Sequence, residues 1–326
     1  MRVQYRMPDT NSTSYNVNNR LAPQLPPSTP ARAAPIPEPK PGPVLLEIDC
    51  ALDYQVDGAS EFIFLIHAAE DEAQTVLQET LQIEPSTPYR TYRDPHSGNR
   101  FLRLQAEAGP LQVAYRATVQ RMVSLPDLDA REVPVRNIPD DVLRFLMPTR
   151  YCESDHLGQD AQGLFGALPG GHTRVLAICD WVRTHVEYRI GSSNATTTAR
   201  DVYLQRAGVC RDFAHLSVTF CRALNIPARL VSGYASFPEP PPDFHAIFEA
   251  YLGGRWVQFD PTGMAPVQHV VRLASGRDAK DVAFATIFGP ARMVSMRPDI
   301  RLADRQTAPP PQGPLDDSLH QNANTT

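Results

Sequence analysis

The sequence predicts an α+β protein in which an antiparallel β-sandwich precedes a domain of helices and strands. Between residues 44 and 124, short β-rich segments alternate with turn signals, which is typical of an antiparallel sandwich. The second half of the chain changes to helical periodicity and then forms a β-hairpin pattern. The 326 residues are enough for two modest domains. We therefore expect a β domain at residues 44–124, a linker at 125–148 and a second domain at 149–305.

The two ends of the chain differ in composition from this folded part. Residues 1–43 are polar and then dense in proline, and residues 306–326 have the same character. Such segments bury too little apolar surface to offset the entropy cost of ordering, so both are expected to be disordered. The proline-rich arm at residues 1–43 is a candidate docking segment for a partner domain.

Composition argues against several classes of protein. The net charge is −5 and Lys and Arg form no basic blocks, so we expect no nucleic acid partner. The longest apolar runs, such as residues 62–66, are too short to cross a membrane, and the first residues lack the apolar stretch of a secretory signal. The five cysteines form no C-x-x-C pair, which indicates free thiols in the cytoplasm.

The linker and the start of the second domain carry clear boundary signals. Prolines recur through residues 125–148 and would interrupt any long helix there. Residues 174–188 then place apolar side chains at helical intervals, so we expect a helix with Trp181 and Tyr188 packed in the core. A Ser- and Thr-rich segment next caps a second short helix before residue 208.

A third helix is predicted to begin at Cys210. Phe213, Leu216, Phe220 and Leu224 form one apolar stripe along it. A thiol in the first turn meets unpaired backbone N–H groups and the positive end of the helix dipole, and both favour the thiolate. The alternative is a small buried apolar residue, the commonest fate of a free cysteine. That interpretation suits the other cysteines of the core better: Cys50, Cys179 and Cys221.

The hairpin at residues 245–260 supplies a base and its partner. Two strands are joined by the two-residue loop at residues 253–254, which fixes the register. Pairing Leu252 with Arg255 makes His245 and Asp260 diagonal neighbours on one face. That face is the more polar one, so we expect it to be open to substrate and the other face to be core.

An Asp beside a His can hold one imidazole nitrogen as a donor and leave the other free to take a proton from a thiol. A polar hairpin face often carries such a pair without any catalytic role. Cys210 favours the catalytic interpretation, because a helix-borne Cys followed by a strand-borne His and an Asp is the order found in papain-like enzymes.

Five further residues are weaker candidates for a functional site. Cys152 and His156 have metal-ligand spacing, but no further ligand is clustered nearby, so we expect no metal. His215 lies five residues after Cys210 and would turn away from the thiol. Gln205 is a candidate second oxyanion donor, with a solvated glutamine as the alternative, and Tyr234 is a candidate for lining the cleft.

Four runs of the sequence resemble the bacterial transglutaminase-like superfamily: GVCRDFAHL, CRALNIPARLVSGY, DFHAIFEAYLGGRWVQFDPTG and GRDAKDVAFATIFG. The resemblance spans residues 151–289, and residues 44–124 resemble the β domain that commonly precedes this core. It implies a papain-like α+β core, in which a helix-borne Cys packs on an antiparallel sheet, with no metal and no organic cofactor. By resemblance, the nucleophile, base and orienting carboxylate fall on Cys210, His245 and Asp260.

The resemblance leaves the reaction open. We expect hydrolysis of a peptide or protein amide through a thioester, because water is abundant and transfer requires a site that excludes it. The first alternative is a protein-glutamine gamma-glutamyltransferase, in which a lysine amine resolves the thioester. The second is a non-catalytic scaffold or binding protein that retains the fold.

Overall fold

The computed structural model describes residues 41–237 and 243–303. The predicted disorder of the two chain ends and the docking role of the proline-rich arm concern segments almost entirely outside these residues. Gly42 and Pro43, which the prediction included in the arm, already belong to the first strand. None of the helices in the described part combines the length and apolar character needed to span a bilayer.

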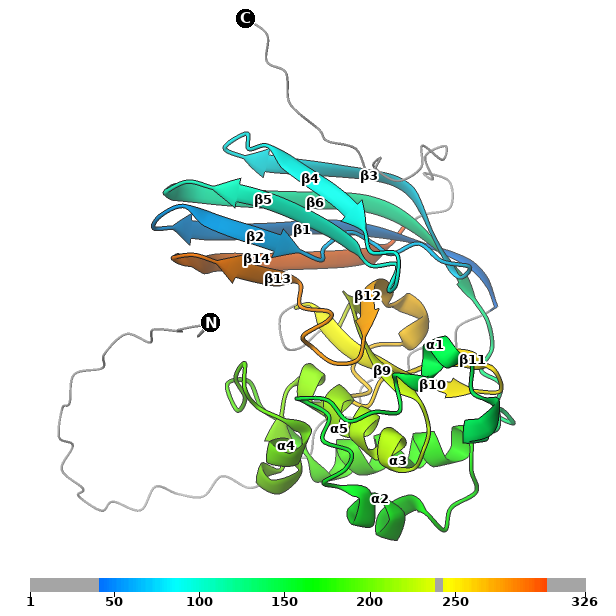
Figure 1. Cartoon of the computed structure of the whole chain (residues 1–326). Helices are drawn as coiled ribbons and strands as arrows, with labels where there is room; N and C mark the ends of the chain where they lie inside the picture. Colours follow the sequence, from blue (N-terminus) through cyan, green and yellow to red (C-terminus); the bar gives the residue numbers. More distant parts are fainter. Residues whose placement is uncertain (1–40, 238–242, 304–326) are drawn as a thin grey trace, which may run out of the picture. The chain divides into compact units, whose positions relative to one another are not determined.

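The first half of the structure is an antiparallel sandwich of two four-stranded sheets, as predicted (Figure 1). The first sheet has the order β14-β1-β6-β3, formed by β1 (Gly42–Val56), β3 (Gln74–Glu84), β6 (Gly109–Val123) and β14 (Ala291–Leu302). The second has the order β13-β2-β5-β4, formed by β2 (Ser60–Phe64), β4 (Tyr89–Arg93), β5 (Arg100–Ala106) and β13 (Ala285–Phe288). The sequence pattern had indicated β1, β2, β5 and β6 but not the other four strands.

Two strands of the sandwich come from the end of the described chain. β14 pairs antiparallel with β1 from Leu46↔Leu302 to Val56↔Ala291, and β13 pairs with β2. The sequence analysis had assigned both segments to the second domain, residues 149–305. They complete the edges of the first-domain sheets instead, because β1 and β2 would otherwise present unpaired backbone groups there.

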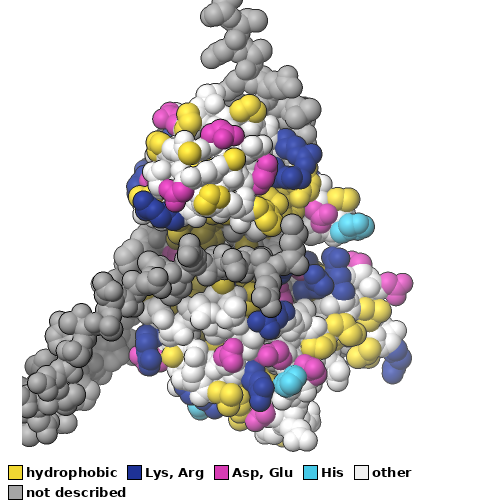
Figure 2. Space-filling model, turned by 60° about the vertical axis from the view of Figure 1, so that its left-hand side comes forward, with side chains coloured by type: hydrophobic (Ala, Val, Ile, Leu, Met, Phe, Trp, Pro, Cys, Tyr) yellow, Lys and Arg dark blue, Asp and Glu magenta, His cyan; other side chains and the backbone are white. Residues whose placement is uncertain are grey.

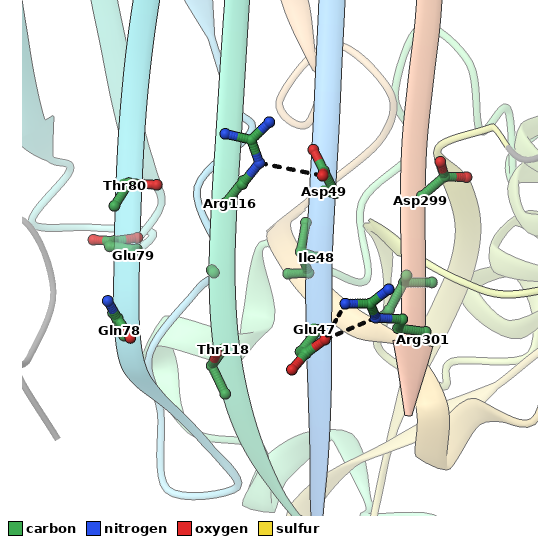
Figure 3. A pocket seen from close by; sticks show the side chains of 12 residues that line it. Glu47, Ile48, Asp49, Gln78, Glu79, Thr80, Arg116, Thr118, Asp299 and Arg301 are labelled. Atoms are coloured by element: carbon green, nitrogen blue, oxygen red, sulfur yellow. Dashed lines mark hydrogen bonds and ion pairs between the residues drawn. The ribbon is translucent and has the colours of Figure 1, made fainter. Parts of the chain in front are cut away.

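Alternating residues along β1 explain how the sandwich is held together. Leu52, Tyr54 and Val56 point inward and are buried, and the Tyr54 ring packs 5.3 Å from Phe62 and 5.9 Å from Phe64 of the second sheet. The opposite face of the first sheet is polar. A hollow of about 680 Å³ is lined by side chains of this sheet. Figure 3 labels most of them, including the ion pair of Arg116 with Asp49.

The second domain contains an antiparallel sheet with the order β11-β10-β9-β12. Its strands are β9 (Ala228–Tyr234), β10 (His245–Leu252), β11 (Arg255–Phe259) and β12 (Val271–Gly276). Its main helices are α2 (Gly158–Phe165), α3 (His172–His185), α4 (Ala199–Gln205) and α5 (Cys210–Ala223). Short elements connect them: η1 (Val135–Asn137), α1 (Asp140–Leu143), β7 (Glu187–Tyr188), β8 (Ala207–Gly208) and η2 (Val267–His269).

Helix α5 is the centre of this domain. It contacts β9 and β10 on one side and α2, α3 and α4 on the other (Figure 1). It is therefore buried around most of its circumference, and not only along the predicted apolar stripe. Its buried hydroxyls remain satisfied, because Ser217 Oγ donates to Phe213 O at 2.9 Å and Thr219 Oγ1 donates to His215 O at 2.7 Å.

The expectation that one face of the hairpin is open to substrate is wrong for β10, which is buried on both faces. Ile247 packs with Val270 in a small apolar cluster, and Tyr251 packs with Val142 of the proline-punctuated connector. The polar residue between them, Glu249, tolerates burial because Arg229 donates to its carboxylate at 2.6 Å. A residue in a buried ion pair therefore gave the β10 sequence the polar pattern of an exposed face.

The sandwich and the second domain are joined by specific polar contacts. Gln74 Nε2 donates to Arg272 O at 2.9 Å, and Arg272 N donates to Gln74 Oε1 at 2.9 Å. The Tyr234 hydroxyl at the end of β9 donates to Ile66 O at 2.8 Å. On the face shown in Figure 2, basic, acidic and hydrophobic side chains are interspersed and no single kind gathers over it.

Candidate active site

Cys210 begins α5, as the sequence predicted. The helix start is held by Asp212, whose Oδ2 accepts from Val209 N at 2.9 Å. The Cys210 thiol is partly exposed and donates weakly to Phe244 O at 3.9 Å. The remaining cysteines, Cys50, Cys152, Cys179 and Cys221, are between 0% and 5% exposed. Cys210 is therefore the thiol that a reagent or substrate can reach.

The hairpin brings His245 and Asp260 together as predicted. Leu252 pairs with Arg255, and His245 is the first residue of β10 while Asp260 directly follows β11. His245 Nε2 lies 3.0 Å from Asp260 Oδ2, and the two side chains are 0% and 4% exposed. The register of a two-residue loop thus delivers the contact that the sequence indicated.

Asp260 is held by four hydrogen bonds. Its Oδ1 accepts from Thr262 N at 2.9 Å and Thr262 Oγ1 at 2.6 Å, and its Oδ2 accepts from Ala265 N at 3.1 Å and His245 Nε2. Burial alone would raise the pKa of Asp260, but these donors and the His245 charge lower it below its ordinary value. The group is therefore an ionised, fixed acceptor for His245.

The other His245 nitrogen, Nδ1, is buried and has no partner of good hydrogen-bond geometry in the described residues. The Cys210 thiol is a neighbouring group that raises the pKa of this ring. Burial lowers the pKa of His245, whereas the hydrogen bond to Asp260 and the charges of Asp260 and the nearby Cys210 raise it more strongly, to about 10. The ring also packs 5.4 Å from Phe237, which limits its rotation.

Tyr188 packs against the core, as predicted. Its side chain is partly buried and its ring lies 5.8 Å from Phe213 of α5. The two-residue strands β7 and β8 pair in parallel and place Tyr188 beside Gly208, two residues before Cys210. No periodicity reveals this pairing, because each strand has only two residues.

Several other candidates lie elsewhere. Gln205 is exposed and its Nε2 donates to Ala207 O at 2.8 Å, which fits the solvated alternative. Tyr234 is fully buried at the junction with the sandwich and does not line a cleft. His215 is buried, with Nε2 accepting from Ala279 N. Within residues 41–237 and 243–303, no cluster of His, Cys, Asp and Glu could hold a metal ion.

These elements define a class of α+β protein in which a helix-borne cysteine lies against a strand-borne His–Asp pair. Residues 161–261 match the family model of the transglutaminase-like superfamily, and residues 45–141 match that of the bacterial transglutaminase N-terminal domain. A solved structure, "Putative Cysteine Protease from Cytophaga hutchinsonii", is 41% identical and covers 85% of this chain and 96% of its own, with a TM-score of 0.77. The chain belongs to the transglutaminase-like superfamily.

Similarity to curated proteins is more limited. An uncharacterized protein of Mycobacterium leprae is 34% identical over 120 residues, which are 33% of this chain and 42% of that protein. An uncharacterized protein of Mycobacterium tuberculosis is 34% identical over 116 residues, or 31% of this chain and 37% of that protein. The chain thus spans about two fifths of the length of the curated relatives it matches.

Proposed function

We propose that the chain is a cysteine-dependent hydrolase of peptide or protein amides. Cys210 is the nucleophile, His245 the acid and base, and Asp260 the group that orients His245. One observation carries this proposal: His245 Nε2 donates to Asp260, whose carboxylate is fixed by three further hydrogen-bond donors. The other ring nitrogen, Nδ1, is therefore left for the thiol. Membership of a superfamily with a similar "Putative Cysteine Protease" supports the assignment to enzymes.

The reaction follows from these three groups. Cys210 Sγ attacks the amide carbonyl carbon, and the carbonyl π electrons move to oxygen. As the intermediate collapses, the C–N bond breaks and His245 donates its Nδ1 proton to the leaving amine, which leaves a thioester. Water then attacks the thioester while His245 takes one of its protons. Release of the acid regenerates Cys210.

The raised pKa of His245 sets the pH dependence. Because its pKa in the folded protein is about 10, the imidazolium persists at neutral pH and is lost only as the pH rises through that value. Its stabilising contribution is complete below the ordinary His pKa of about 6.5 and disappears at high pH. We expect this positive charge beside the sulfur to make Cys210 more reactive than the buried cysteines.

Alkylation by iodoacetamide, read by peptide mass spectrometry, tests this ion pair. At pH 6 we expect Cys210 to react about 30- to 100-fold faster than an ordinary thiol, which is mostly protonated at this pH. In His245→Ala the rate should fall to that of an ordinary thiol. His156→Ala is the matched control, since the His156 side chain is exposed and pairs with Asp155 at 3.9 Å. Slow labelling of wild-type Cys210 would instead support the scaffold alternative.

Product analysis distinguishes hydrolysis from transfer. We incubate the enzyme with a glutamine-containing peptide and putrescine and expect the glutamate product to exceed the amine adduct, because Cys210 is partly exposed and water reaches the thioester. A dominant amine adduct would instead identify a protein-glutamine gamma-glutamyltransferase. Self-crosslinking is simple to map, since Lys40 and Lys280 are the two lysines of the sequence.

We also propose that the protein works in the cytoplasm. The support is chemical: all five cysteines are free thiols, which a reducing compartment preserves. Trapping thiols in intact cells checks this, because an oxidised set of cysteines would contradict it.

A further inference from the structure

We propose that a cavity between the sandwich and the β9–β12 sheet of the second domain binds a small oxyanion, a phosphate or a carboxylate, with Arg121 as its anchoring charge. The cavity has a volume of about 480 Å³, which leaves room for such an ion and several waters. Arg121 lines it from β6, and Arg229, Gln258 and Arg272 line it from strands of the second domain. None of the three candidate catalytic residues lines it, so the inference is independent of the proposed function.

Arg121 carries a buried charge that no carboxylate meets directly. The residue is 7% exposed. Its Nη1 donates to the carbonyl oxygens of Val267 and Val270, and its Nη2 donates to Gln258 Oε1 at 3.1 Å. Its Nε is buried and has no hydrogen-bond partner among the residues that the structure describes. All three acceptors are neutral, so the guanidinium is hydrogen-bonded without being neutralised.

The carboxylates of the inner wall are already paired with other guanidinium groups. Glu249 pairs with Arg229 at 2.6 Å and with Arg272 at 3.3 Å, and Asp71 pairs with Arg272 as well. The inner wall therefore holds three guanidinium groups, those of Arg121, Arg229 and Arg272, against two carboxylates. One positive charge is left over, and a bound anion would balance it.

The remaining charged residues of the cavity lie at its more exposed rim. Asp127 pairs with Arg255 at 3.4 Å, and their side chains are 49% and 56% exposed. Glu72 is also exposed. Solvent screens these charges far more than those of the inner wall, so the excess positive charge at Arg121 persists.

The free protein stabilises this charge poorly. Burial lowers the pKa of Arg121 to about 10, although the charge of Glu249 raises it in part. Moving a guanidinium out of water costs free energy unless a counter-charge and hydrogen bonds replace the lost solvation. An oxyanion supplies both, because its oxygens accept from N–H donors and arginine has five of them.

Titration calorimetry and thermal unfolding of the full chain test the proposal, with inorganic phosphate and acetate as separate probes. Sodium chloride keeps the ionic strength constant. We expect at least one of the two anions to bind at a single site and to raise Tm by about 5–10 °C at about 100 times its Kd. The anion that binds more tightly identifies the site as one for phosphate or for carboxylate. If neither anion binds saturably, the proposal is wrong.

Arg121→Met removes the charge and keeps an unbranched side chain. We expect the Kd of the anion to rise by at least about tenfold, the usual effect of losing charge-assisted hydrogen bonds. Arg116→Met is the matched control, because Arg116 lies on the same strand but its side chain is 59% exposed and pairs with Asp49. Its Kd should equal that of wild type. Equal Kd values in wild type and Arg121→Met, or a rise in Tm that never saturates and is the same in all three proteins, would contradict a specific site.

Arg121→Lys covers the case in which the methionine variant does not fold. Lysine keeps the charge but lacks the planar fork of N–H donors, so we expect Kd to rise several-fold while binding is retained. An unchanged Kd would show that Arg121 does not hold the anion. Cys210→Ser should bind the anion as tightly as wild type, because Cys210 does not line the cavity. The outcome is thus read whether or not the chain is a thiol hydrolase.

Discussion

Asp260→Asn is expected to lower kcat for amide hydrolysis by about 10³- to 10⁴-fold with little change in KM. The reason is the number of donors that meet at this carboxylate. Thr262 N and Thr262 Oγ1 donate to Oδ1, while His245 Nε2 and Ala265 N donate to Oδ2. An asparagine replaces one acceptor oxygen by an NH₂ donor, so one of these two sets must lose its acceptor.

If the asparagine NH₂ faces His245, the ring must accept at Nε2 and carry its proton on Nδ1, and a neutral ring of that tautomer cannot take the thiol proton. Steady-state kinetics on an amide identified by screening measures the loss. Glu249→Gln is a matched control, because Glu249 is equally buried on β10 but pairs with Arg229 and Arg272. This control should lose stability and keep kcat. A kcat of Asp260→Asn within about tenfold of wild type would sink the orienting role.

Glu79→Gln is expected to destabilise the protein by about 3–5 kcal/mol, the largest effect on stability that we predict for a single polar residue. Glu79 Oε1 lies 2.5 Å from Arg100 Nη2 in the sandwich core, where the two side chains are 0% and 4% exposed. Tyr115 also donates to Glu79 at 2.5 Å. Gln leaves the Arg100 charge buried without its counter-charge, which costs far more than a lost surface contact.

The matched control for this substitution lies on the opposite face of the same sheet. Asp49 pairs with Arg116 at 3.2 Å, but the side chains are 60% and 59% exposed, as seen on the outer face in Figure 3. Asp49→Asn should change stability by less than about 1 kcal/mol. Urea unfolding of both variants gives the comparison. Equal effects of the two substitutions would contradict the argument from burial.

The pH dependence of the Glu79 effect follows from its pKa. Burial would raise that pKa, but the hydrogen bonds and charge of Arg100 lower it below the ordinary value. The contribution of Glu79 is therefore present at neutral pH and is lost as the pH falls below the ordinary Glu pKa. Wild type should consequently lose more stability on acidification than Glu79→Gln, and unfolding measured across pH checks this.

Much of the candidate site follows from local sequence. The start of α5 at Cys210 is encoded by the apolar stripe and by Asp212, and the contact of His245 with Asp260 is encoded by the two-residue loop at residues 253–254. Both are short-range features, since helix periodicity and hairpin register are set by neighbours in the chain. Pairing of the thiol with His245 rested on the family resemblance in addition to these local signals.

Three features needed the tertiary structure. β13 and β14 complete sheets that begin more than 200 residues earlier, and pairing across that separation leaves no local pattern. Glu249 reads as an exposed polar residue because its partner Arg229 lies on another strand. The pairing of β7 with β8, which brings Tyr188 beside Gly208, involves only two residues on each strand and leaves no periodic pattern.

By itself, the sequence determined the α+β class, the sandwich-then-core order, and the positions of Cys210, His245 and Asp260 on their elements, because these depend on periodicity, capping and turn length. Only the tertiary structure decided which segments close the sandwich, which polar residues are buried in ion pairs, and which short strands pair beside the start of α5. Those outcomes depend on contacts between segments distant in the chain, and a linear pattern does not record them.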